Sequence, residues 1–275
     1  MQISATLVKE LREKTGAGLM NCKKALSESD GNIDEAVKLL REKGMATASK
    51  KASRDASEGR VFIQSNANKT QALVLELNCE TDFVAGNSEF SVFGNTIATA
   101  ILENSSMNSV TEVESLTIDG KTYEELVSEY TLKLGEKIGI KKFVRVNSSF
   151  PIFSYIHSNG KIGTAVSFDT AIEEGLGKSI AMQVAASSPR CVKRDQVDPN
   201  DIEQEKTIIK KMAENENRPE KIIDKIISGK LEKFFKEICL LEQAYILDDK
   251  QSVQSALGSG TVVEFVRYAI GTADS

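Results

Sequence analysis

The chain has 275 residues, of which 40% are hydrophobic and 27% are charged, a balance typical of a water-soluble protein with two or three folded modules. Its formal net charge of −5 argues against a protein that holds nucleic acid directly by its phosphates. No apolar run approaches the ~20 residues of a membrane helix, and the N-terminus lacks the pattern of a secretory signal or of an organelle transit peptide. We therefore expect a cytoplasmic protein without a membrane partner.

Residues 1–45 have the pattern of three short helices. Ser4 can cap the first helix, and the glycine-containing run at 15–18 ends it. A second apolar stripe follows and is broken at Gly31. Asn32, with Glu35 three residues later, predicts the cap of a third helix, and Gly44 suits the position just after its end.

Residues 46–59 are rich in Ala, Ser and Lys and are expected to form a linker or an exposed helix. Lys50, Lys51 and Arg54 make a local basic cluster, which RNA could contact. A solvated helix face is the favoured interpretation of this cluster.

After Gly59 the hydrophobic pattern changes to a period of two, which indicates strands. The expected elements are strands at 61–63 and 73–77 with a turn at 65–69, helices at 90–101 and 123–134, and a strand at 142–146. The same order then recurs: strands at 153–157 and 162–168 around an Asn-Gly turn, a helix at 176–186, and a strand at 264–268. The sequence Phe-Val-Arg occurs in both closing strands, at 143–145 and 265–267.

This order predicts an α+β protein with two related core subdomains and small antiparallel sheets. We assign residues 1–54 to a helical domain and linker, 55–148 to the first subdomain and 149–275 to the second. Two isoleucine-rich stripes predict an inserted antiparallel helical hairpin of coiled-coil type at about 198–230. Its stripes face either each other or a second chain. Residues 104–120 and 234–249 show no clear pattern.

Enzyme chemistry has little support in the sequence. The cysteines at positions 22, 79, 191 and 239 lie at no metal-ligand or redox spacing and are interpreted as buried apolar residues. The Gly-x-Gly at 16–18 lacks a preceding strand, and there is no nucleotide-binding loop motif. A thiol dyad of Cys79 with His157, the single histidine, is the one enzymatic alternative. We expect no enzyme activity, metal or cofactor.

One loop, Thr81-Asp82-Phe83-Val84, stands between a strand and a helix. In a structural interpretation, Asp82 caps the helix and Phe83 packs into the core. In a functional interpretation, Phe83 is an aromatic anchor on a rigid tip, the kind of side chain that dominates interfaces. The residues alone favour the structural interpretation.

At this point the sequence resembles the elongation factor Ts family. The segments that carry the resemblance are 7–12, 15–18 and 22–26 near the N-terminus, Cys-Glu-Thr-Asp-Phe-Val at 79–84, and 181–186 and 265–268 toward the C-terminus. The resemblance implies a ubiquitin-associated-like three-helix domain, a core of two subdomains and a helical hairpin. A departure is Gly86, where the family usually has lysine.

The resemblance also implies a partner, elongation factor Tu, in its GDP-bound and nucleotide-free forms. Residues 1–54 would dock on the partner's nucleotide domain through Arg12, Leu19 and Met20, although Leu19 and Met20 could instead fill the bundle core. Asp82 and Phe83, flanked by Thr81 and Val84, match the family's intruding pair. His157 matches a histidine that lies near the partner's phosphate-binding region.

The function that follows is guanine nucleotide exchange during translation elongation, in which GDP release results from disruption of the partner's magnesium and phosphate site. The first alternative is a ubiquitin-associated-type protein-binding module on an unrelated scaffold. A thiol enzyme using Cys79 and an RNA-binding protein using the basic cluster are less favoured. A homodimer or a two-to-two complex with the partner stays open.

Overall fold

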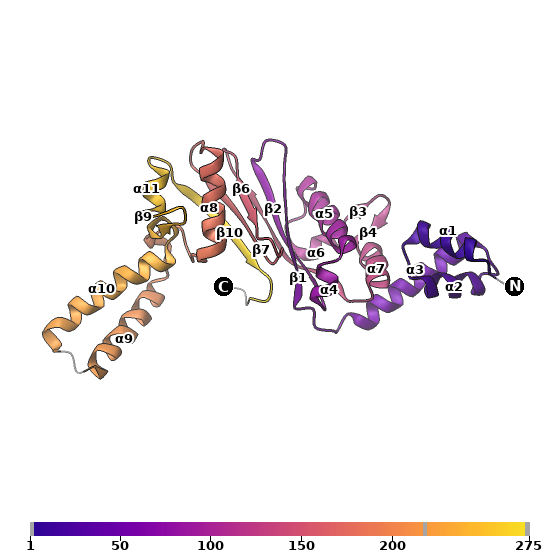
Figure 1. Ribbon diagram of the computed structural model, residues 1–275, viewed down its shortest axis with the longest axis horizontal. Helices are drawn as coiled ribbons and strands as arrows, with labels where there is room; N and C mark the ends of the chain where they lie inside the picture. The colour runs from indigo at the N-terminus through magenta and orange to yellow at the C-terminus, as the bar shows by residue number, and fades with distance from the viewer. Residues whose placement is uncertain (1–2, 217–218, 273–275) are drawn as a thin grey trace.

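The computed structural model describes residues 3–216 and 219–272, and its mixture of helices with small antiparallel sheets confirms the α+β class. The molecule is elongated (Figure 1). A three-helix segment lies at one end, two sheets with their covering helices lie in the middle, and a helical hairpin projects at the other end. Within the described ranges, no helix is long and apolar enough to cross a membrane.

Helices α1 (Ala5–Thr15), α2 (Leu19–Glu28) and α3 (Ile33–Lys51) form the N-terminal segment. The expected caps are present: the Ser4 side chain accepts a hydrogen bond from the backbone N–H of Leu7, and the Asn32 side chain accepts one from Glu35. Gly16 ends α1 with a φ of 65°, a left-handed conformation that glycine adopts at little cost. A small apolar core, formed by Val8, Leu11, Ala17, Cys22, Ala25, Leu26, Ala36 and Leu40, holds the three helices together.

The expectation that Gly44 ends the third helix is wrong, because α3 continues to Lys51. Gly44 is buried against α7 (Tyr123–Leu134), where a Cβ would lie 3.1 Å from the carbonyl oxygen of Ser128. The glycine therefore permits close packing of two helices. An ion pair between Arg41 and Glu125 joins the same two helices, so α3 connects the N-terminal segment to the core as a continuous rod.

The two three-stranded sheets have the same topology. In the first, β1 (Glu58–Ser65) pairs with β2 (Gln71–Cys79), which pairs with β5 (Ile138–Asn147). In the second, β6 (Phe153–Ile156) pairs with β7 (Ile162–Phe168), which pairs with β10 (Val262–Ala269). All four pairings are antiparallel, as the repeated sequence pattern predicts.

Each sheet packs one face against the helices of its own unit and the other face against the other sheet. The helices α5 (Ser88–Glu103) and α7 cover the first sheet, and α8 (Glu174–Ser187) covers the second. Alternate strand residues, among them Val61, Val74 and Ala165, form a separate apolar layer between the sheets. The result is a four-layer core of helices, sheet, sheet and helix.

The two units also share a packing device. On α5, a Cβ at Gly94 would lie 2.2 Å from the ring of Phe62 in β1. On α8, a Cβ at Gly177 would lie 2.3 Å from the ring of Phe153 in β6. In both units, a glycine lets the helix approach an aromatic ring of the first strand.

The hairpin comprises α9 (Pro199–Asn215) and α10 (Glu220–Ile238), so its second helix extends beyond the predicted limit near 230. Part of the expected turn, residues 217–218, lies outside the described residues. Ile209 and Ile223 are buried, whereas Ile208, Met212 and Ile222 are exposed, so the apolar stripes are wider than their mutual contact.

In the two segments without a clear sequence pattern, residues 234–238 continue α10, and the other elements are short: α6 (Val110–Val113), β3 (Thr117–Ile118), η2 (Leu240–Glu242), β8 (Ala244–Tyr245) and the start of β9 (Asp248–Ser252). Further short elements are β4 (Lys121–Thr122), η1 (Arg194–Gln196) and α11 (Val253–Leu257).

Candidate partner-binding site

The loop after β2 presents an exposed aromatic side chain. A four-residue helix, α4 (Asp82–Ala85), follows the strand, and its cap is Thr81, whose hydroxyl accepts a hydrogen bond from the N–H of Val84 at 3.4 Å. Phe83 is 86% exposed and Asp82 is exposed, while Val84 is buried against the core. The structural interpretation of this loop is therefore wrong on both points: Asp82 is not the cap, and Phe83 does not pack inside.

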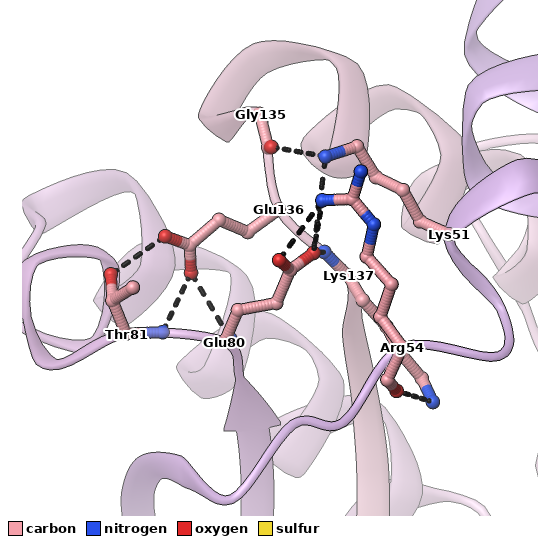
Figure 2. Close-up of polar contacts among 7 residues, drawn as sticks. All are labelled: Lys51, Arg54, Glu80, Thr81, Gly135, Glu136 and Lys137. Atoms are coloured by element: carbon pink, nitrogen blue, oxygen red, sulfur yellow. Dashed lines mark hydrogen bonds and ion pairs between the residues drawn. The ribbon is translucent and has the colours of Figure 1, made fainter.

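A carboxylate from a distant segment holds the start of this loop (Figure 2). One oxygen of Glu136 accepts hydrogen bonds from the backbone N–H groups of Glu80, at 3.1 Å, and of Thr81, at 2.9 Å. The other oxygen accepts one from the Thr81 hydroxyl at 2.6 Å. Glu136 follows Gly135, the left-handed residue that ends α7. The base of the Phe83 loop is thus fixed by three hydrogen bonds to one side chain.

Glu80 adds a second set of contacts beside the first (Figure 2). Its carboxylate accepts a hydrogen bond from the backbone N–H of Lys137 at 2.7 Å and pairs with Arg54 at 3.1 Å and Lys51 at 3.8 Å. The pKa of Glu80 is lowered, first by the Lys137 hydrogen bond and then by Arg54 and Lys51, because all of them favour the ionised form.

These contacts bear on the basic cluster of the linker. Lys51 also donates to the carbonyl oxygen of Gly135 at 2.6 Å, so two of the three cationic side chains are engaged within the protein. The third, Lys50, is exposed and is not one of the side chains that pair with Glu80. The arrangement favours a structural role for the cluster over RNA binding.

The β6–β7 hairpin of the second core unit contacts the first sheet at the end where the Phe83 loop begins. The N–H of Val61 donates to the carbonyl oxygen of Gly160 at 2.9 Å, and Lys161 pairs with Glu58 at 2.7 Å. The pKa of Lys161 is raised mainly by its hydrogen bond to Glu58, and the negative charge of Asp82 adds to the shift. Glu58 is also paired with Cys79 across β1 and β2, three residues before Asp82, so Asp82 and this hairpin lie at the same end of the first sheet.

His157 lies in this hairpin and is exposed. Its Nδ1 is 3.1 Å from the hydroxyl of Tyr155, a contact that orients the imidazole ring while it faces solvent. The structure thus brings the His157 hairpin and the Phe83 loop to one end of the core, although the two residues lie in different units.

The N-terminal candidates form a second exposed surface. Leu19 is 58% and Met20 is 72% exposed, so the interpretation that places them in the bundle core is wrong. Both begin α2, just after the turn at Gly18, and Arg12 on α1 is exposed as well. Helices α1 and α2, which carry these three residues, lie at one end of the molecule, whereas α4 lies near its middle (Figure 1).

The geometry gives no support to a thiol enzyme. Cys79 is fully buried and its Sγ donates to the carbonyl oxygen of Thr81 at 3.1 Å. Burial, followed by the negative charge of Glu136, raises the pKa of Cys79 to about 12, so the thiol is protonated at neutral pH and is a poor nucleophile. Among the described residues, no group of three or more His, Cys, Asp or Glu side chains could hold a metal ion.

The positions of Glu80 and Glu136 were not anticipated from the sequence. Glu80 belongs to the 79–84 signature, so the sequence indicates that this residue lies near the candidate site but not which groups it contacts. Glu136 is 55 residues from Thr81, and only the pairing of β2 with β5 brings the two together.

An exposed aromatic ring on a loop held by Glu136, with a second exposed apolar surface at a distance, is typical of the class of proteins that bind another macromolecule. The family model described as "Elongation factor TS" matches residues 80–272, which is more than half of the chain. The protein therefore belongs to the elongation factor Ts family, whose members are translation elongation factors and generally the nucleotide exchange partners of elongation factor Tu. The match begins at the first residue of the braced loop and leaves the three-helix segment outside it.

Proposed function

We propose that this protein is a guanine nucleotide exchange factor for elongation factor Tu and that Phe83 is the side chain that promotes GDP release. The observation that carries the proposal is the 86% exposure of Phe83 on a loop whose base is held by Glu136. A large apolar ring costs free energy in water, and it gains that energy back when a partner covers it.

The rigidity of the loop matters for the mechanism. GDP is held in such partners by a phosphate-binding loop and a magnesium ion. Phe83, inserted beside the magnesium site, would displace the groups that position the ion and the phosphate loop. Because the braced loop loses little conformational entropy on insertion, more of the binding free energy is left to distort the partner. No bond is made or broken.

Two further contacts complete the proposed interface. Arg12, Leu19 and Met20 would dock on the nucleotide domain of elongation factor Tu, and His157 would lie near its phosphate-binding region. Linkage requires that a factor which weakens GDP binding is itself bound more weakly when GDP is present. The nucleotide-free partner should therefore bind this protein more tightly than the GDP-bound partner.

The test is stopped-flow release of fluorescent GDP from purified elongation factor Tu, with and without the full chain. We expect release to accelerate by orders of magnitude at substoichiometric amounts of the protein. A folded protein that binds the partner without accelerating release would refute the exchange function and favour the protein-binding alternative. A folded protein that neither binds nor accelerates release would remove elongation factor Tu as its partner.

A further inference from the structure

Two cysteines that are far apart in the sequence lie side by side at the base of the helical hairpin. The Sγ atoms of Cys191 and Cys239 are 3.7 Å apart, although 48 positions separate the residues. Cys191 follows α8 on the way to α9, and Cys239 follows the last residue of α10. Both thiols are free.

The backbone around the pair is already aligned. Cys191 and Cys239 form an isolated parallel β-bridge, in which the N–H of Leu240 donates to the carbonyl oxygen of Cys191 at 2.9 Å. On one side, the N–H of Arg190 donates to Ile238 at 2.8 Å, and on the other the N–H of Leu241 donates to Val192 at 3.1 Å. Neighbouring strands lie about 4.8 Å apart, within the Cα separation of about 4.4–6.8 Å that a disulfide spans. The aligned backbone therefore places the two residues within disulfide range, and rotation of the side chains can bring the two sulfur atoms together.

The other two cysteines have different surroundings. The Sγ of Cys22 donates to the carbonyl oxygen of Ala17 within the N-terminal bundle, and that of Cys79 donates to Thr81 in the first core unit. Both are buried. They offer matched control positions within the same chain.

The two thiols of the pair differ in access. Cys191 is partly exposed, whereas Cys239 is fully buried. Burial raises the pKa of Cys191, and burial together with the neighbouring Cys191 thiol raises the pKa of Cys239 to about 12. Oxidation is therefore slow and begins at Cys191. Because the reduced thiols gain no stabilisation as thiolates, the disulfide is also resistant to reduction once formed.

We propose that Cys191 and Cys239 are an oxidation site that forms an intramolecular disulfide with a peroxide as oxidant, locking the base of the hairpin. The Cys191 thiol loses its proton, the thiolate attacks one peroxide oxygen and the O–O bond breaks, and the hydroxide that leaves takes up this proton, so that a sulfenic acid and water result. The Cys239 sulfur then attacks the sulfenic sulfur, the S–O bond breaks, and a second water leaves with the Cys239 proton. For hydrogen peroxide, two thiols and one peroxide give one disulfide and two waters.

The position gives this bond a mechanical consequence. The hairpin projects from the core (Figure 1), and its base is where the chain enters α9 and leaves α10. Reversible contacts hold this base in the reduced form: Arg194 pairs with Glu232 at 2.7 Å and with Glu242 at 2.5 Å, and its guanidinium lies over the ring of Phe235 at 4.5 Å. A covalent bond at the same place would limit opening of the base. This inference does not depend on the exchange function.

The test treats the native full chain with hydrogen peroxide, alkylates the remaining thiols, and maps peptides without reduction. Before alkylation, the intact chain of natural sequence should have lost the mass of two hydrogen atoms, and after alkylation and digestion it should yield one linked peptide pair containing Cys191 and Cys239. The Cys22→Ser variant should behave in the same way, and Cys191→Ser and Cys191→Ala should yield no linked pair. Dithiothreitol added to the oxidised chain before alkylation should restore its original mass.

The thermal midpoint provides an independent measurement. A disulfide that closes the loop between Cys191 and Cys239 should raise the thermal midpoint of the oxidised chain by roughly 5–10 °C. The same treatment should not raise the midpoint of Cys191→Ser. The proposal is overturned if Cys191 gains oxygen without a linked peptide, if both thiols stay free, or if the link forms only in denaturant.

Discussion

Substitution of Phe83 by alanine separates the binding role of this residue from any role in folding. Because the side chain is 86% exposed, its removal should change the free energy of unfolding by no more than about 0.5 kcal/mol. Phe90, which is fully buried in the adjacent core, is the contrast: Phe90→Ala should lower the free energy of unfolding by about 3–5 kcal/mol. Urea unfolding of both variants measures this difference.

The effect of Phe83→Ala on exchange should be large. An aromatic anchor at the centre of an interface contributes about 2 kcal/mol or more, which corresponds to a loss of roughly 30-fold or more in the rate of GDP release per unit concentration of factor. Stopped-flow release of fluorescent GDP from elongation factor Tu measures it. Val92→Ala, at a 53% exposed position on α5, controls for the loss of exposed apolar surface and should leave exchange unchanged.

Two results would refute this reasoning. If Phe83→Ala unfolds as readily as Phe90→Ala, the ring contributes to the core and its exposure has been misjudged. If Phe83→Ala is stable but accelerates GDP release as well as the original chain does, the aromatic wedge is not the means of exchange.

Three further predictions concern the exposed surface at Leu19 and Met20, the Glu80 contacts beside the Phe83 loop, and the packing of α5 on β1. Replacing both Leu19 and Met20 by alanine should weaken binding to elongation factor Tu by about tenfold or more without lowering the unfolding midpoint; an unchanged affinity by calorimetry would remove the docking role. Because the pKa of Glu80 is lowered in the folded protein, the contribution of its carboxylate to stability is complete above the ordinary pKa of 4.5 and is lost as the pH falls through the lower folded value. Glu80→Gln should therefore reduce the pH dependence of the free energy of unfolding on the acid side. Urea titrations at several pH values measure this dependence, and identical slopes for the variant and the original chain would contradict the prediction. Gly94→Ala should destabilise the protein by about 1–3 kcal/mol, because its Cβ would lie 2.2 Å from the ring of Phe62; equal or greater stability would mean that the ring yields freely.

Much of the local structure could be predicted because short-range patterns determine it. The caps at Ser4 and Asn32, the strand β2 and the turn around Gly160 each depend on neighbours within a few residues. The repeated order of hairpin, helix and strand likewise predicts two sheets of the same topology. The 79–84 signature identified the family in the same direct way.

The outcomes at individual residues depended on contacts between distant segments. Gly44 suits a helix end, but packing against Ser128 of α7 keeps it inside a longer helix. The apolar side chain of Phe83 suits a core position, but Val84 and Ala85 occupy the inward face of α4, so the Phe83 ring is exposed to solvent. A four-residue helix has too few positions for a hydrophobic period to predict which side chain faces solvent.

The sequence by itself therefore determined the main helices and strands, their order and the family of this protein. Only the tertiary structure decided which side chains are free to meet a partner and which are held, as Thr81 is by Glu136, or placed together, as Cys191 is with Cys239. The physical reason is that caps and periodicities act over one or two turns of chain, whereas exposure and proximity arise when strand pairing and helix packing bring together residues about fifty positions apart.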